Sequence, residues 1–255
     1  MRQLGRPTFY IGAATFVIVV CIAGFGPSLV DQSRRTGPPT VLMKTHGVIT
    51  SVWLLLFLVQ ATLVAARRTD VHRRLGLITV IVTFAMIVIG VLTVIEGGRR
   101  GYDLSGDLGR ATIPPASPPP TGADAIAAGM FPPLLGFFAF GSLVAMGLWF
   151  RHRPEIHKRL MVLALLDLTL VPLLHLAGFL IGRWPTLYAP LSMAVSLTSR
   201  LLLFAPAIHD KATLGRIHPV SLWMPLVLFA GAGLLFVLVQ PSSAWRQFSL
   251  WLVGY

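Results

Sequence analysis

The chain has 255 residues, of which 55% are hydrophobic and only 12% are charged. Its mean hydropathy is +0.77. This composition excludes a soluble globular domain, whose surface needs more polar residues, and predicts a multi-pass membrane protein. The net charge of +12 does not indicate nucleic-acid binding, because basic residues of membrane proteins collect in loops that face the cytoplasm. The single cysteine, Cys21, excludes an intrachain disulfide, and the lack of CxxC motifs excludes c-type haem attachment.

Seven apolar runs follow one another along the chain, each near the length of about 20 residues that a helix needs to span a bilayer. They cover residues 10–30, 46–66, 75–95, 130–150, 159–181, 187–207 and 222–240. The predicted fold class is therefore all-α, with residues 1–255 forming one transmembrane domain of about seven helices. The first run lacks a small-residue cleavage site, so we interpret it as a retained helix and not a signal peptide.

The connections between the runs indicate the orientation of the chain. Three short connections on the side of the N-terminus are densely basic, which predicts a cytoplasmic N-terminus and an outer C-terminus. We expect a bacterial inner (plasma) membrane location, with the lipid bilayer and its anionic cytoplasmic headgroups as partners. The long connection 96–126 is rich in Pro, Gly and Ser, which predicts a flexible outer loop. Aromatic residues after Gln240 recur at helical spacing, which suits an interfacial helix or the frayed end of the last span.

Two similar basic segments connect spans two to three and four to five. RTDVHRRLG begins at Arg68 and RPEIHKRLM begins at Arg153, an offset of 85 positions. Because this offset covers two spans, the two copies have the same orientation in the membrane. The pattern predicts an internal parallel repeat of two helical hairpins, residues 46–95 and 130–181.

Local helix chemistry explains most residues of these two hinges. Asp70 and Glu155 fall in the first turn of the following helix, where a carboxylate complements the helix dipole, and Pro154 suits the first helical position. The basic residues that follow are expected to point toward anionic lipid headgroups. They are Arg73, Arg74, Lys158 and Arg159.

A resemblance to known proteins is carried by three segments: FYIGAATFVIVVCIAGFGPS, HGVITSVWLLLFLVQATLVAARRTDVHRRLG and RHRPEIHKRLMVLALL. They resemble a group of uncharacterised bacterial inner-membrane proteins with an HRRLG and HKRLM hairpin pair. That resemblance covers spans one to six and implies no activity. Paired hairpins with histidines near helix ends are also similar in architecture to two-haem cytochromes b, including the ascorbate- and ferric-reducing type and haem A synthase. This second likeness implies that haem b is a candidate cofactor.

Four histidines are candidate axial ligands, since haem b takes two imidazoles from different helices at a common depth. His46 opens the second span and His175 lies roughly 10 Å below the outer end of the fifth, so this pair predicts an outer haem or quinone site. His72 and His157 match in the repeat and form the inner candidate pair, beside basic residues that suit haem propionates. For each of these four histidines, the alternative is a position in the membrane interface without any bound ligand. No HxxxH or HExxH spacing occurs, and we predict no dedicated metal site.

Two charges lie within the predicted spans. Asp167 and Arg200 fall at matching depth in spans five and six, and each alone would cost about 2.5 to 3.5 kcal/mol at a helix centre. We therefore predict an intramembrane ion pair, which serves either as a clamp or, with His175, as a proton or anion relay. Pro172 predicts a kink in the same span.

Three functions agree with these features. The first is a non-catalytic accessory or structural membrane module with a protein partner, which requires only packing, helix caps and lipid contacts. The second is a b-type haem or quinone-binding electron-transfer protein that uses the histidine pairs. The third is a small-solute or proton transporter built around Asp167, Arg200 and His175. The sequence contains no nucleophile with a paired base and no phosphate-binding loop, so it predicts no catalytic residue.

Overall fold

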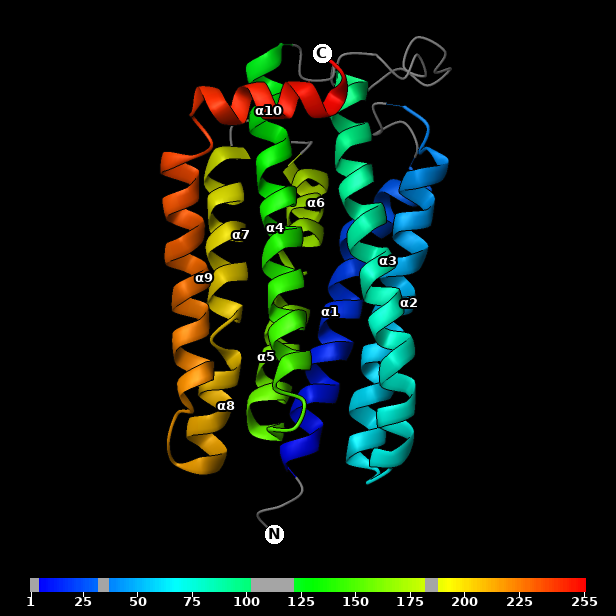
Figure 1. The fold of residues 1–255 in the computed structure, drawn as a ribbon, viewed down its shortest axis with the longest axis vertical. Coiled ribbons are helices and arrows are strands. Elements are labelled where there is room, and N and C mark those ends of the chain that lie inside the picture. Colours follow the sequence, from blue (N-terminus) through cyan, green and yellow to red (C-terminus); the bar gives the residue numbers. More distant parts are fainter. Residues whose placement is uncertain (1–4, 32–36, 102–121, 182–187) are drawn as a thin grey trace.

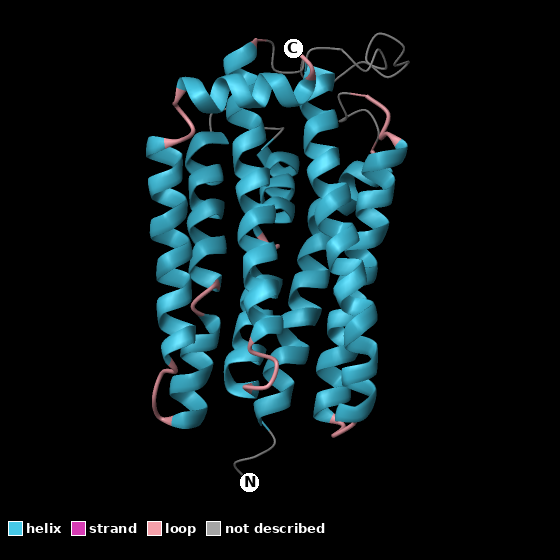
Figure 2. Ribbon diagram, viewed as in Figure 1, coloured by secondary structure: helices cyan, strands magenta, loops and turns pink. Residues whose placement is uncertain are grey.

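The computed structural model describes residues 5–31, 37–101, 122–181 and 188–255. Throughout these ranges the regular secondary structure is helix, in ten segments (Figure 2), which confirms the predicted all-α class. The helices are α1 (Gly5–Val30), α2 (Val41–Ala65), α3 (Thr69–Gly101), α4 (Ala123–Trp149), α5 (Pro154–Asp167), α6 (Leu170–Ile181), α7 (Tyr188–Leu202), α8 (Ala205–Leu214), α9 (Pro219–Leu238) and α10 (Ser243–Val253).

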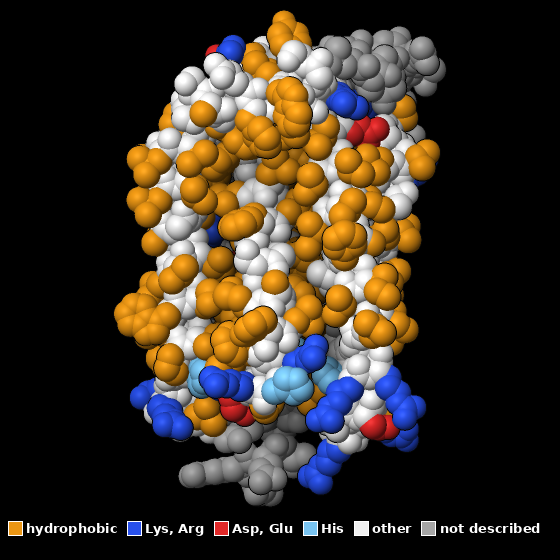
Figure 3. Space-filling model, in the orientation of Figure 1, with side chains coloured by type: hydrophobic (Ala, Val, Ile, Leu, Met, Phe, Trp, Pro, Cys, Tyr) orange, Lys and Arg blue, Asp and Glu red, His pale blue; other side chains and the backbone are white. Residues whose placement is uncertain are grey.

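The described helices form an elongated bundle, and apolar side chains cover the middle of the face drawn in Figure 3. Six segments are long and apolar enough to cross a membrane: α1, α2, α3, α4, α9, and α5 together with α6. α7 and α8 follow one another between the same two ends of the bundle (Figure 1). The sixth predicted span, residues 187–207, is therefore present as α7 and the first residues of α8. These features confirm a multi-pass membrane protein.

Two helix breaks in the bundle have the same local cause. α5 ends at Asp167 and α6 begins at Leu170, so the kink predicted from Pro172 is a full interruption of the helix. Proline has no N–H group and cannot donate to the carbonyl four residues earlier, here that of Leu168. Pro206 has the same effect at the junction of α7 and α8, where the carbonyl four residues earlier belongs to the last residue of α7.

Helix packing brings the polar face of α2 against α3. The Trp53 indole N–H donates to Thr83 Oγ1 at 2.8 Å, and the Gln60 amide donates to Thr79 Oγ1 at 3.2 Å. Trp53 is fully buried in a core to which α1 to α5 contribute. His46, Trp53 and Gln60 recur every seven residues, which puts them on the one face of α2 that turns toward the bundle.

α1 approaches α6 most closely at a glycine. A Cβ atom at Gly24 would overlap backbone atoms of Pro172, whereas one at Gly26 would meet nothing within 4 Å. Small residues allow membrane helices to pack with their backbones in contact. The chain therefore requires glycine at position 24 but not at position 26.

The hinge between α2 and α3 contains an unusual backbone conformation. Arg67 has φ of 59°, a left-handed value that favours glycine. The Arg68 N–H donates to the Leu63 carbonyl and the Arg67 N–H to the Val64 carbonyl, at 2.8 and 3.1 Å. These two bonds are a Schellman motif, which normally ends in glycine.

α10 lies across one end of the bundle and covers it (Figure 1). This end is opposite to the one where α1 begins. The Trp245 indole N–H donates to the Ala127 carbonyl of α4 at 2.9 Å. The tail is thus a separate helix and not a frayed end of the last span. α3 extends to Gly101 and α4 begins at Ala123, so both ends of the predicted loop 96–126 are helical. The rest of that loop, residues 102–121, lies outside the described residues.

Candidate functional site

Basic side chains gather at the end of the bundle where α1 begins (Figure 3). The α2–α3 hinge, the α4–α5 hinge and the α8–α9 connection all lie there (Figure 1). The structure confirms Asp70 and Glu155 in the first turns of α3 and α5, and Pro154 at the helix start. We refer to this region as the basic end; it contains Arg67, Arg68, Arg73, Arg74, Arg151, Arg153, Lys158, Lys211 and Arg216.

The fold brings His72 and His157 together at the basic end. His72 lies in the first turn of α3 and His157 in the first turn of α5. Their ring centres are 6.4 Å apart and the ring planes meet at 79°. Two residues 85 positions apart in the sequence thus form one side-chain pair between the two hairpins.

Hydrogen bonding determines which nitrogen of His157 is available. Its Nδ1 lies 2.7 Å from the Gly147 carbonyl oxygen. Because a carbonyl only accepts, Nδ1 carries the proton, and Nε2 of the neutral ring keeps a free lone pair. Nδ1 of His72 is buried without a hydrogen bond of normal geometry, although the ring interacts with the backbone of Gln60.

The outer histidines are placed differently. His46 packs edge-to-face on Phe137, with ring centres 5.8 Å apart. His175 packs on Phe25 at 4.8 Å. α1 packs against both α2 and α6, which carry these histidines. Within the part of the chain that the structure describes, the two outer rings make no contact with each other.

Asp167 ends α5 and Arg200 lies in the last turn of α7. Arg200 attracts the Asp167 carboxylate electrostatically. No hydrogen bond or ion pair joins the two side chains among the described residues. The close intramembrane pair therefore stays a prediction, as does the relay with His175.

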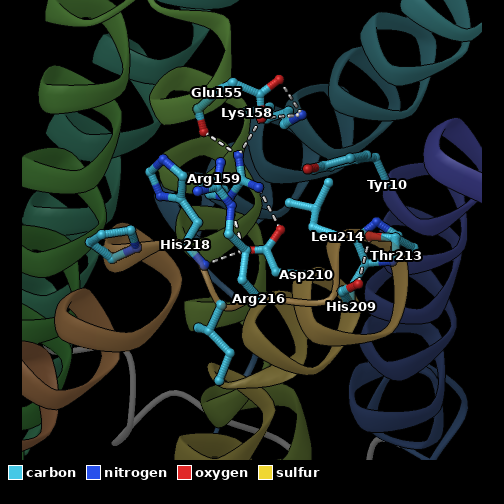
Figure 4. Close-up of a pocket in the computed structure, with 12 residues that line it drawn as sticks. Tyr10, Glu155, Lys158, Arg159, His209, Asp210, Thr213, Leu214, Arg216 and His218 are labelled. Carbon is cyan, nitrogen blue, oxygen red and sulfur yellow. Dashed lines mark hydrogen bonds and ion pairs between the residues drawn. The ribbon is translucent and has the colours of Figure 1, made fainter.

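A buried ion pair also lies at the basic end, and the sequence did not predict it. Arg159 and Asp210 are 1% and 2% exposed. The Arg159 guanidinium donates two parallel hydrogen bonds to the Asp210 carboxylate, with Nε 2.9 Å from Oδ2. It also donates to Glu155 Oε2 at 2.7 Å. The expectation that Arg159 points toward lipid headgroups is wrong, because the buried carboxylate of Asp210 binds its charged group inside the bundle (Figure 4).

The Asp210 carboxylate accepts further hydrogen bonds from α9 and its N-terminus. Ser221 Oγ donates to Oδ2 at 2.6 Å and the His218 backbone N–H donates at 3.3 Å. Burial disfavours the charged form, but the hydrogen bonds from Arg159 and Ser221 outweigh it and hold the pKa of Asp210 below its usual range. The network joins α5, α8 and α9.

A cavity of about 680 Å³ opens beside this network. α1 contributes Tyr10, α5 contributes Lys158, α8 contributes His209 and Thr213, and the α8–α9 connection contributes Arg216 (Figure 4). Its volume falls within the range of small-molecule sites, about 300 to 1,000 Å³. We call it the basic-end cavity.

Comparisons with protein-family models, with curated proteins and with solved structures find no match for this chain.

One signal for the buried pair is present in the sequence. The chain has only nine Asp and Glu residues, and Asp210 is one of few acids in the basic connections. An acid in that setting needs a cationic partner. Its spacing of 51 residues from Arg159 gives no indication of which basic residue that partner is.

Proposed function

We propose that this protein is a membrane-bound b-type haem protein whose iron is ligated by His72 and His157, and that it transfers electrons. The observation that carries the proposal is the distance of 6.4 Å between the two imidazole centres.

This distance matches two imidazoles on one metal ion. A metal ion that is bound at about 2 Å from each ligating nitrogen would fit between two imidazoles whose ring centres are 6.4 Å apart. Nε2 of His157 has the free lone pair that a ligand needs, because Nδ1 donates to Gly147. The two ligands come from different helices, as in other bundle haem sites.

The number of ligands favours haem over a bare metal ion. A structural zinc site takes four protein ligands and a catalytic one three. Among the described residues, no group of three or more His, Cys, Asp or Glu side chains is placed to hold a metal. A pair of histidines suits a metal that brings four ligands of its own, as haem iron does.

The chain's own residues would also serve the rest of the cofactor. Arg73 follows His72 in the sequence, and a basic group suits the carboxylates of haem propionates. Haem would supply the one-electron chemistry. We further propose that the basic end faces the cytoplasm, which the gathering of Lys and Arg there supports (Figure 3).

The test is an absorption spectrum of the detergent-purified protein, oxidised and then dithionite-reduced, with a pyridine haemochrome assay on the same sample. We expect near-stoichiometric haem and a sharp reduced α-band. His72→Ala and His157→Ala should each abolish the two-histidine spectrum. The matched control is His152→Ala, an exposed histidine of the same hinge, which should keep it.

The opposite result has an equally clear meaning. A colourless protein from cells with ample haem would refute the proposal and leave two imidazoles in edge-to-face contact, a common packing of aromatic rings. Haem retained in both His72→Ala and His157→Ala would refute the assigned ligands. In the colourless case the accessory membrane module predicted from the sequence becomes the leading function.

A further inference from the structure

The basic-end cavity is separate from the histidine pair, and most of its charges are already matched. Its lining holds three cations, Lys158, Arg159 and Arg216, against two carboxylates, Glu155 and Asp210. Both acids accept hydrogen bonds from Arg159. One net positive charge therefore remains when the histidines are neutral.

Arg216 carries that remaining charge. It is exposed and makes no hydrogen bond or ion pair with any residue that the structure describes. In Figure 4 it lies among the side chains around the cavity. A guanidinium offers several N–H donors in a planar fork that matches phosphate oxygens. A free arginine at the cavity is thus a natural ligand for an anion.

Lys158 is available to the same ligand. Its Nζ lies 2.8 Å from Glu155 Oε2, but the two side chains are 35% and 60% exposed. Such exposed pairs contribute about 0 to 1 kcal/mol, so the ammonium group can turn to a stronger partner at little cost. Hydroxyl groups of Tyr10 and Thr213 also line the cavity.

The wall of the cavity is partly apolar. Leu214 and Ile217 line it and remain 37% and 42% exposed. Ile208 on α8 and Trp223 on α9 are 70% and 63% exposed nearby in the sequence, on helices that belong to the lipid-facing bundle. A ligand with a phosphate group and an attached apolar part would meet both kinds of surface.

From these contacts we propose that the basic-end cavity binds a phosphate group, held by Arg216 and Lys158, with an anionic phospholipid headgroup as its source. The acyl chains would lie along the apolar residues of α8 and the α8–α9 connection. The buried Arg159–Asp210 pair forms the rigid wall of the site and is not itself a ligand. This proposal does not depend on haem binding.

Native mass spectrometry of the delipidated protein provides the test. The protein is offered equal amounts of phosphatidylglycerol and phosphatidylcholine, and the bound fraction of each is counted. We expect preferential binding of phosphatidylglycerol. Arg216→Gln should weaken it about fivefold and Arg216→Gln with Lys158→Gln about 25-fold, since each basic residue near anionic lipid contributes about 1 kcal/mol.

The matched control is Lys211→Gln. Lys211 is an exposed basic residue of α8, five positions before Arg216, and is not among the residues that line the cavity. It should bind phosphatidylglycerol as the unsubstituted protein does. An equal loss in Lys211→Gln and Arg216→Gln would overturn the proposal, because binding would then follow the general charge of the basic end. Unchanged binding in the double variant would overturn it as well.

A second arm uses inorganic phosphate to distinguish the two sources of the ligand. If millimolar phosphate displaces phosphatidylglycerol, and its own binding is lost in Arg216→Gln but not in Lys211→Gln, the cavity recognises phosphate from solution too. If phosphate has no effect while the lipid binds, the headgroup and its apolar part are both needed.

Discussion

Removal of the Asp210 carboxylate should destabilise the protein more than any exposed substitution at the basic end. The side chains of Arg159 and Asp210 are 2% and 3% exposed, so Asp210→Ala leaves a buried guanidinium with only Glu155 as a charged partner. Breaking a buried ion pair in this way costs about 3 to 5 kcal/mol. We expect a value near 4 kcal/mol for Asp210→Ala, and a smaller one for Asp210→Asn, whose amide oxygen still accepts one hydrogen bond.

The measurement is the free energy of unfolding in mixed detergent micelles, followed by tryptophan fluorescence. Glu155→Gln is the control, because the Glu155 side chain is 60% exposed and should contribute about 1 kcal/mol or less. The double variant Arg159→Met with Asp210→Leu removes both charges and should recover about 2 kcal/mol relative to Asp210→Ala. The reasoning is refuted if Asp210→Ala costs no more than Glu155→Gln, or if the double variant is no more stable than Asp210→Ala.

The same pair predicts a dependence on pH. The pKa of Asp210 is lowered in the folded protein, so the folded state binds the proton of this group less tightly than the unfolded chain does. The stabilisation is fully present above the unfolded pKa of about 3.9 and is lost as pH falls through the folded value. The difference in unfolding free energy between the unsubstituted protein and Asp210→Asn should therefore be constant from neutral pH down to about pH 5 and shrink below pH 4.

Three further predictions concern single positions. Gly24→Ala should lower the unfolding free energy by about 1 to 3 kcal/mol, because the added methyl group overlaps α6. Gly26→Ala should leave the unfolding free energy unchanged or raise it by up to about 1 kcal/mol. Equal effects of the two substitutions would contradict the close approach of α1 and α6 at Gly24. Arg67→Gly should raise the unfolding free energy by about 1 kcal/mol, because glycine adopts the left-handed conformation of this position without strain. Arg68→Gly should not raise it. Burial lowers the pKa of His218, and the positive charge of Arg159 lowers it further. The Nδ1 atom of His218 accepts the hydrogen bond from the Val220 N–H that caps α9. Protonation of the imidazole therefore destabilises the fold. Between pH 7.5 and 5.5 the unfolding free energy of the unsubstituted protein should fall relative to that of His218→Asn, whose side-chain oxygen still caps α9. If the unfolding free energies of the two proteins change in parallel with pH, the reasoning is contradicted.

Local features of the structure follow from the sequence alone. The length of the apolar runs predicts membrane helices because the bilayer requires every backbone group to be bonded within its helix. Pro172 predicts a kink at the place where the helix breaks before α6, and Asp70 and Glu155 predict the first turns of α3 and α5. Each of these features depends on interactions within a few residues, and the chemistry of the side chain is sufficient to decide it.

The partners of the other polar groups were decided by the tertiary structure. The repeat in the sequence predicts His72 with His157, whose rings lie close together. No pattern predicts Arg159 with Asp210, which are joined across 51 positions, because the helices between them decide which residues meet. His46 and His175, which the sequence also places at a common depth, pack on aromatic rings of different helices, Phe137 of α4 and Phe25 of α1, and their shared site stays a prediction. Depth along a span can be counted from the sequence, because the rise per helical residue is constant. Rotation of each helix and its choice of neighbours depend on packing over the whole bundle, and these decide whether two side chains at one depth lie side by side or on different helix faces.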